Sequence, residues 1–339
     1  MKTRVICLGE ALIDFVADTA GVSLEECPGF RKAPGGAPGH VAVGLARLGV
    51  PASFVGKVGN EPFGRFLRDT FAAAGVDTGP MRLSSEARTG LAFVSLTANG
   101  ERDFLFYRHP SADMLLRWDE VPETLFTDAR ILHHGSITLI SEPSRTATIV
   151  AGAHAREAGC LVSYDVNLRL PLWPSEAAAR EGIKEGLTGV HIVKVSEEEG
   201  EFLLDTHTPE ETAAKLLLGG ARLVVVTRGA AGAYCRWWQE DHLQELAVPG
   251  FPVAAVDTTG AGDGFVAGLL AGVMAEPALE RIVPERMQSI LTVANAVGAL
   301  TCTQKGAIPA LPTQAQVARF LASHGVPSAP GTPVSEPTA

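Results

Sequence analysis

The sequence is poor in cysteine, and its cysteines form no motif for metal or redox chemistry. There are five in 339 residues, an odd number, far apart and without a Cys-x-x-Cys pair. This spacing argues against a zinc site and against a redox dithiol. We therefore expect reduced, structural thiols in a cytosolic, cytoplasmic protein.

Segments that would direct the chain into or across a membrane are missing as well. No uninterrupted apolar run reaches the ~20 residues that a membrane span requires. Lys2 and Arg4 precede an apolar stretch, but Glu10 and Asp14 interrupt that stretch and no small-residue cleavage site follows. We therefore expect neither a secretory signal nor a membrane partner.

Runs of basic residues are also absent, and the formal net charge is −10. Because a phosphate backbone needs a basic face, nucleic acid is not expected as a partner. The P-loop pattern G-x-x-x-x-G-K-[ST] is absent too, which excludes that class of ATP-binding enzyme. A hydrophobic content of 46% still allows a large core.

Short β-branched runs alternate with helical patterns along the chain. Strand-like runs begin at Val5, Ala52, Arg130, Cys160, Val190 and Arg222, and helical ones at His40 and Phe63. This alternation is typical of a parallel sheet with helices on both faces. We predict an α/β fold with a doubly wound, mostly parallel sheet.

Two segments, residues 10–34 and 88–108, are extended without an intervening helix, and the second turns at Asn99-Gly100. Their alternation predicts a small antiparallel β lid on a domain that spans residues 1–324. A lid would keep bound ATP from water. The alternative is an edge extension of the main sheet. Residues 325–339 are rich in Pro, Ser and Thr, and we expect a disordered tail.

The segment DTTGAGDGFVAGLLAGV runs from glycines and threonines into a helical apolar pattern. It places Gly260, Ala261, Gly262 and Asp263 at a helix N-terminus. Free N–H groups, the positive end of the helix dipole and small side chains make such a start a site for phosphoryl oxygens. The alternative is an ordinary helix start capped by a threonine, with an acid in its first turn.

A second glycine turn lies near the N-terminus, in KAPGGAPGHVAVGLARLG. Gly35 and Gly36 allow close approach of a ligand to the backbone, and an amphipathic helix follows. Asp14 stands in a strand-like run, GEALIDF, where a buried acid needs hydroxyl groups to accept from. A sugar supplies such hydroxyl groups. The alternative is that Asp14 faces solvent on the strand and binds no ligand.

These motifs resemble the two signatures of the ribokinase-like (PfkB) family of carbohydrate kinases. The resemblance implies Asp263 as catalytic base, with the backbone of Gly260, Ala261 and Gly262 around the transferred phosphoryl group. It also implies sugar contacts, which are made by Asp14, Gly35, Gly36 and the residue at position 40. Here His40 stands where the family usually has Asn, and it either contacts the sugar or lies on the helix face without a ligand.

Weaker segments follow the order of the family. Arg169 corresponds to an arginine near the transferred phosphate and a hexose hydroxyl, although an arginine after a strand is more often a surface residue. Glu199, with Ser196 before it, corresponds to a glutamate that acts on Mg²⁺ through water, although four acids in five residues also suit a solvated helix face. The resemblance further implies nucleotide contacts at Thr227, Gly229 and Asn295, and a K⁺ ion near Asp257 and Thr259.

Within the family, the sequence most resembles the fructokinases, in GEALIDF, FYRHPSADMLL with Arg108, VKVSEEE and KGAIPALP. Departures occur at His40, His109 and Asn60. The resemblance implies a kinase that phosphorylates the primary hydroxyl of D-fructose to fructose 6-phosphate, with ATP and Mg²⁺. The apolar alternation of the expected lid sheet favours a homodimer. The alternatives are a kinase for 2-keto-3-deoxygluconate, ribose or a riboside, or a non-catalytic fructokinase-like regulatory protein.

Overall fold

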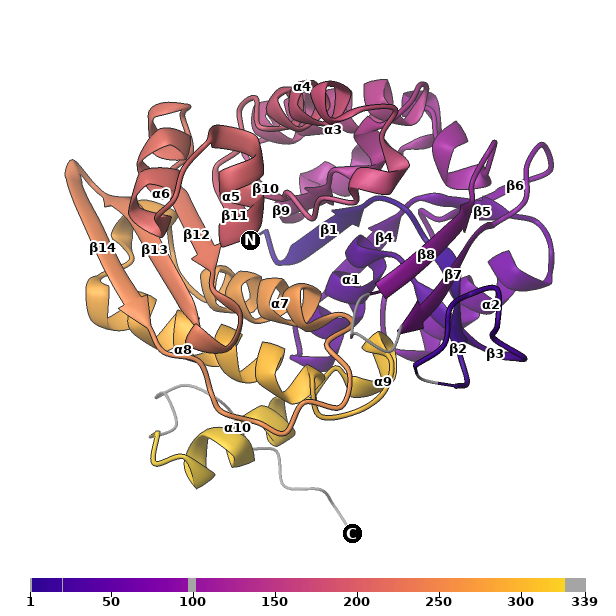
Figure 1. Cartoon of the computed structure of the whole chain (residues 1–339). Helices are drawn as coiled ribbons and strands as arrows, with labels where there is room; N and C mark the ends of the chain where they lie inside the picture. The colour runs from indigo at the N-terminus through magenta and orange to yellow at the C-terminus, as the bar shows by residue number, and fades with distance from the viewer. Residues whose placement is uncertain (1, 20, 97–101, 327–339) are drawn as a thin grey trace, which may run out of the picture.

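A computed structural model describes residues 2–19, 21–96 and 102–326 (Figure 1). Three sheets are present in that part of the chain: one of eight strands, one of four and one of two. The strands are β1 Arg4–Leu8, β2 Leu12–Ala17, β3 Phe30–Gly35, β4 Ala52–Val55, β5 Lys57–Gly59, β6 Arg82–Ser84, β7 Gly90–Leu96, β8 Arg102–Tyr107, β9 Ala129–Gly135, β10 Leu161–Asp165, β11 Ile192–Ser196, β12 Leu223–Thr227, β13 Ala233–Gln239 and β14 His242–Val248.

The large sheet has the strand order β14-β13-β12-β11-β10-β9-β1-β4. Its strands from β4 to β12 pair in parallel, as predicted. An antiparallel hairpin, β13 with β14, completes one end and was not predicted. Its turn at Glu240 and Asp241 contains neither Gly nor Asn, the usual sequence signal for a tight hairpin.

Helices cover both faces of this sheet (Figure 1). The α-helices are α1 Ala37–Arg47, α2 Pro62–Ala73, α3 Ser144–Glu157, α4 Glu176–Gly186, α5 Glu197–Leu204, α6 Pro209–Leu218, α7 Ala261–Met274, α8 Pro284–Thr301, α9 Ala307–Ala310 and α10 Gln314–Ser323. Short 3₁₀ helices cover Ala112–Leu115, Trp118–Glu120, Glu123–Thr127, Ile137–Leu139, Leu170–Leu172, Gly229–Ala231 and Leu279–Arg281. In the described part of the chain, no helix is both long and apolar enough to cross a membrane.

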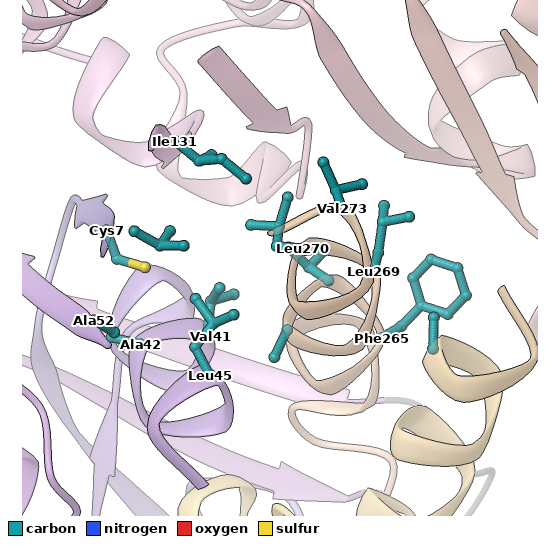
Figure 2. Close-up of a cluster of buried hydrophobic side chains, with 14 of the residues drawn as sticks. Cys7, Val41, Ala42, Leu45, Ala52, Ile131, Phe265, Leu269, Leu270 and Val273 are labelled. Atoms are coloured by element: carbon teal, nitrogen blue, oxygen red, sulfur yellow. The ribbon is translucent and has the colours of Figure 1, made fainter. Parts of the chain in front are cut away.

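Two hydrophobic cores flank the large sheet. One joins the sheet to α1, α7 and α8, and Figure 2 shows part of it, with Val41 and Leu45 of α1 facing Leu270 of α7. The other joins the opposite face of the sheet to α3, α4, α5 and α6. Helix α7 is apolar almost all round, as suits a helix packed between two other helices.

The predicted small sheet is present, with the order β3-β2-β7-β8, and stands beside the large sheet (Figure 1). β2 with β3 and β7 with β8 are antiparallel pairs, whereas the central pair, β2 with β7, is parallel. The predicted turn at Asn99-Gly100 and most of the predicted tail lie outside the described residues. The role of the sheet as a lid stays a prediction.

Candidate active site

The strand order of the large sheet determines where a ligand can enter. From β1 the chain adds β4 on one side and then returns to place β9 on the other, so the order reverses at β1. In open α/β sheets a crevice forms at the carboxyl ends of the strands at such a reversal. Asp14 follows the end of β1, and Asn167 and Arg169 follow the end of β10. These three residues therefore lie at the same edge of the large sheet.

Helix α7 begins at this edge with a cap that has no side-chain hydrogen bond. Its N-cap, Gly260, has φ +79°, and a Cβ there would lie 2.6 Å from the Cβ of Ala307, so only glycine fits. The N–H of Ala261 donates to the carbonyl oxygen of Thr258 at 3.2 Å. Among the residues that the structure describes, no partner is found for the N–H groups of Gly260, Gly262 and Asp263. Three donors therefore remain for an anion, and Ala261, which sequence analysis included, is already engaged.

Asp263, in the first turn of α7, contacts His40 of α1. The Oδ2 atom of Asp263 lies 2.7 Å from Nδ1 of His40, and Nε2 of His40 lies 3.2 Å from the carbonyl oxygen of Pro34. Burial lowers the pKa of His40, but the hydrogen bond and charge of Asp263, together with Asp14, outweigh it and raise the pKa above 6.5. We call Asp14, His40 and Asp263 the His40 cluster.

Asp14 lies against the backbone of the predicted glycine turn. A Cβ on Gly35 would lie 2.5 Å from Oδ2 of Asp14, so a side chain there would displace the carboxylate. Burial raises the pKa of Asp14 to about 6, against the lowering effects of His40 and Arg169. Nη1 of Arg169 donates to the carbonyl oxygen of Leu168 at 3.1 Å.

A second polar cluster, which sequence analysis missed, lies at the ends of β10 and β11. Nζ of Lys194 donates to Oδ1 of Asp165 at 3.0 Å and lies 4.0 Å from Oε2 of Glu199. Burial alone would lower the pKa of Lys194, but the negative charges of Asp165 and Glu199 outweigh burial, and the pKa lies above its ordinary value. A Cβ on Gly262 would lie 3.6 Å from Nζ, so the ammonium group adjoins the start of α7. We call Asp165, Lys194 and Glu199 the Lys194 cluster.

Glu199 uses both carboxylate oxygens to bind backbone N–H groups. Oε2 accepts from Ser196 in a capping box of α5, and Oε1 accepts from Leu168, each at 2.8 Å. Glu197 and Glu198 are exposed, so they form the solvated face that was the alternative for this segment. No group of three or more His, Cys, Asp or Glu that could hold a metal occurs in the described ranges. Both carboxylate oxygens of Glu199 are therefore already engaged by backbone N–H groups.

Arg108 is paired with an acid, and two of the departures are exposed. Arg108 is buried and paired with Asp113, donating from Nε to Oδ2 at 3.1 Å. Its guanidinium is therefore already engaged. His109 and Asn60 are exposed. Arg108 and His109 line a cavity of about 740 Å³ beside the start of α2, which neither Asp14 nor Asp263 lines.

The predicted nucleotide residues lie near the ends of β12 and β14. Thr227 is the last residue of β12, and Gly229 follows with φ +53°. Nδ2 of Asn295 donates to the carbonyl oxygens of Val248 and Pro249 at 3.2 and 3.1 Å, so this amide group fixes the segment after β14.

The loop that was predicted to bind a monovalent cation is held by Asp257. Its Oδ1 accepts from the N–H of Thr259 and its Oδ2 from the N–H of Gly306, both at 2.9 Å. These bonds connect the loop before α7 with the segment before α9.

The chain is similar in sequence and structure to known carbohydrate kinases. The sequence matches the description "pfkB family carbohydrate kinase" over residues 2–314. Fructokinase-1 of Zea mays is 49% identical over 321 residues, which cover 94% of this chain and 98% of that protein. The structure of Xylella fastidiosa fructokinase with bound ATP is 36% identical, has a TM-score of 0.86, and matches over 96% of this chain and 100% of its own.

The fructokinase of Vibrio cholerae O395, in a form with fructose, ADP and calcium ion, is also similar. It is 36% identical with a TM-score of 0.83, over 94% of this chain and 99% of its own. A double mutant of that enzyme with fructose, ADP and potassium ion has the same identity and TM-score, over 94% of this chain and 98% of its own.

Proposed function

The chain belongs to the pfkB family of carbohydrate kinases, and on this premise we propose that it transfers the γ-phosphoryl group of ATP to the 6-hydroxyl of D-fructose. The observation that carries the proposal is Asp263 at the start of α7. This carboxylate stands beside backbone N–H donors that have no partner among the described residues, where a hydroxyl nucleophile and a phosphoryl group can meet. The fructokinase names of the relatives support fructose as the acceptor.

In the proposed reaction, Asp263 accepts the proton of the sugar hydroxyl. The sugar oxygen forms a bond to the γ-phosphorus while the bond from that phosphorus to the bridging oxygen of ADP breaks. The N–H groups of Gly260 and Gly262, with the ammonium group of Lys194 beside them, stabilise the negative charge of the transferring group. Phosphoryl transfer depends mainly on the positioning of the two reactants and on electrostatic stabilisation of the transferring group, and these groups provide both.

The sugar is proposed to bind between the small sheet and the His40 cluster. Asp14 would accept from two of its hydroxyls, as the resemblance implies, and Gly35 and Gly36 would let it approach the backbone. Arg169, which lowers the pKa of Asp14, would donate to a hydroxyl or to the phosphate. The small sheet would cover the site and exclude water.

ATP is proposed to lie along the edge from α7 to β12, near Thr227, Gly229 and Asn295. Mg²⁺ neutralises charge on the phosphates when bound, and Glu199 would act on it through water. A monovalent cation, K⁺, is proposed near Asp257 and Thr259. The calcium and potassium forms of the Vibrio cholerae enzyme support ion binding by this kind of protein.

We also propose that the protein forms a homodimer and is located in the cytoplasm. Leu105 and Tyr107 of β8 are 47% and 59% exposed, and apolar side chains on an exposed sheet support a homodimer. All five cysteines are free thiols, which fits the expected cytoplasmic location.

The test is kcat/KM of the wild-type protein for fructose, 2-keto-3-deoxygluconate, ribose and a purine riboside, each with ATP and Mg²⁺. We expect fructose to give the highest value. If another acceptor exceeds fructose by more than about tenfold, or ~1.4 kcal/mol in transition-state binding, fructose is the wrong substrate while a kinase remains.

A further inference from the structure

His40 is the only member of its cluster that departs from the family signature, and its ring has no polar atom left for a sugar. Nδ1 faces Oδ2 of Asp263 at 2.7 Å, and Nε2 faces the carbonyl oxygen of Pro34 at 3.2 Å. Both neighbours are acceptors. A direct hydrogen bond from His40 to the sugar, one of the two alternatives raised by the sequence, would break one of these contacts.

The packing of two helices fixes this arrangement. α1 and α7 lie side by side (Figure 2). They are so close that a Cβ on Gly44 would lie 2.6 Å from the Cβ of Ala267. His40 and Asp263 each lie four residues, about one turn, before that contact. The same close approach that buries the helices therefore brings the imidazole to the carboxylate. His40 is 4% exposed, so water does not compete for its ring nitrogens.

The number of protons on the ring of His40 decides how many hydrogen bonds it can donate to Asp263 and Pro34. A neutral imidazole has one N–H, so it can donate to only one of its two neighbours, and its second nitrogen would then face an acceptor with a lone pair. An imidazolium donates to both. With Asp263 as a carboxylate, the two contacts are both hydrogen bonds only when His40 carries two protons.

The surrounding charges favour the imidazolium. Asp14 from β2 and Asp263 from α7 both raise the pKa of His40. Arg169 acts on Asp14, and Lys194 on β11 is itself stabilised by Asp263. His133 on β9 is affected by Asp263, but burial lowers its pKa to about 3, so it is neutral and adds no charge. Oε1 of Glu10 accepts a hydrogen bond from the N–H of Ala37 at the start of α1.

We propose that His40 is a positioning residue which, as an imidazolium, holds Oδ2 of Asp263 so that Oδ1 is presented to the sugar hydroxyl. This inference rests on the proposed role of Asp263 as the base. During transfer, the hydroxyl proton moves to Oδ1 and the sugar oxygen bonds to phosphorus. The proton on Nδ1 stays in its hydrogen bond to Oδ2, so His40 is unchanged at the end of the reaction. At higher pH the ring loses one of its two protons, a lone pair then faces either Oδ2 of Asp263 or the carbonyl oxygen of Pro34, and the imidazole no longer holds the base through both hydrogen bonds.

The test is the pH dependence of kcat/KM for fructose in wild type, His40→Asn and His40→Leu. Wild type should lose activity as pH rises through the pKa of His40, because the second proton is then lost. The amide of His40→Asn donates to Asp263 at every pH, so this variant should keep activity and lack that alkaline loss. His40→Leu should be ~10- to 100-fold less active across the range, as expected for losing a hydrogen bond to a charged group. The matched control, His207→Asn, changes an exposed histidine on the surface and should show the wild-type profile.

An alkaline loss of the same size and midpoint in His40→Asn and wild type would overturn the proposal. A second measurement does not depend on turnover: ¹⁵N NMR of the histidine rings, with His40→Asn used for assignment. Two protonated nitrogens on His40 at pH 6 support the proposal, and a neutral ring overturns it. Absence of fructose turnover in wild type would instead overturn the proposed function, and the NMR result would still decide the protonation of His40.

Discussion

The His40 cluster and the Lys194 cluster both adjoin the start of α7, and each is a group of charges of which part is buried. They differ in what their carboxylates bind. In the Lys194 cluster, Asp165 accepts from Lys194 and from the N–H of Asn167, and Glu199 accepts from two backbone N–H groups. In the His40 cluster, Asp263 accepts one hydrogen bond from His40, and Asp14 is only partly buried.

The difference separates a scaffold from a reactive site. A buried charge whose hydrogen bonds are satisfied by the protein holds strands and loops in place. A carboxylate with remaining acceptor capacity in a partly open site can bind a hydroxyl group or take its proton. We therefore expect changes in the His40 cluster to act mainly on catalysis. Changes in the Lys194 cluster should act strongly on stability, in addition to the proposed effect of the Lys194 ammonium group on the transferring phosphoryl group.

The largest expected effect is on turnover. Asp263→Asn removes the base but keeps an oxygen that can accept from His40, so the fold should persist. Loss of a general base typically costs ~10²–10⁴ in rate. We expect kcat for fructose to fall by that factor, while the dissociation constant of ATP, measured by calorimetry, and the free energy of unfolding change little. A variant with wild-type turnover would remove Asp263 from the mechanism.

The next effect is on stability. Lys194→Met leaves the buried carboxylates of Asp165 and Glu199 without their cation, and breaking a buried pair in this way typically costs ~3–5 kcal/mol. Urea unfolding should show a loss of that order, and adding Asp165→Asn should restore part of it. Lys184 on α4 is exposed, and its change to Met should stay within ~0.5 kcal/mol. If the two lysine variants behave alike, the Lys194 cluster is not a scaffold.

The smallest effect is on sugar binding. Asp14→Asn replaces a charged acceptor, so KM for fructose should rise by ~10- to 100-fold. Because burial raises the pKa of Asp14 to about 6, the wild-type carboxylate is ionised only above that pH. The KM of wild type should therefore fall as pH rises from about 5 to about 7. The KM of the variant should lack this change, and a KM that is the same in both proteins would exclude Asp14 from the sugar site.

The sequence predicted the elements whose signals are local. The glycines before Asp263 indicated a helix start, and the strand-like runs indicated the parallel sheet, since backbone geometry and periodicity act over a few residues. The pattern from Ser196 to Glu199 also had the form of a capping box, which the structure contains. We did not predict this capping box, because the segment was interpreted either as the family element that acts on Mg²⁺ or as a solvated acidic face.

Contacts between distant residues could not be predicted in this way. His40 and Asp263 are 223 positions apart, and only the packing of α1 on α7 brings them together. Lys194 had a signal that was not used: a lysine within an apolar strand, VHIVKV, has to find a buried partner. Its partner, Asp165, is on the neighbouring strand β10, so the register of the sheet was needed to identify it.

The most direct test of the account is ³¹P NMR of the wild-type protein with Mg²⁺, ATP and D-fructose. We predict that the γ-phosphorus signal of ATP is replaced by that of a phosphomonoester at the 6-position of fructose, with one ADP formed for each ester. A product phosphorylated at another position would contradict the proposed orientation of the sugar. Formation of inorganic phosphate alone, or no change in the spectrum, would contradict the account of this chain as a fructose kinase.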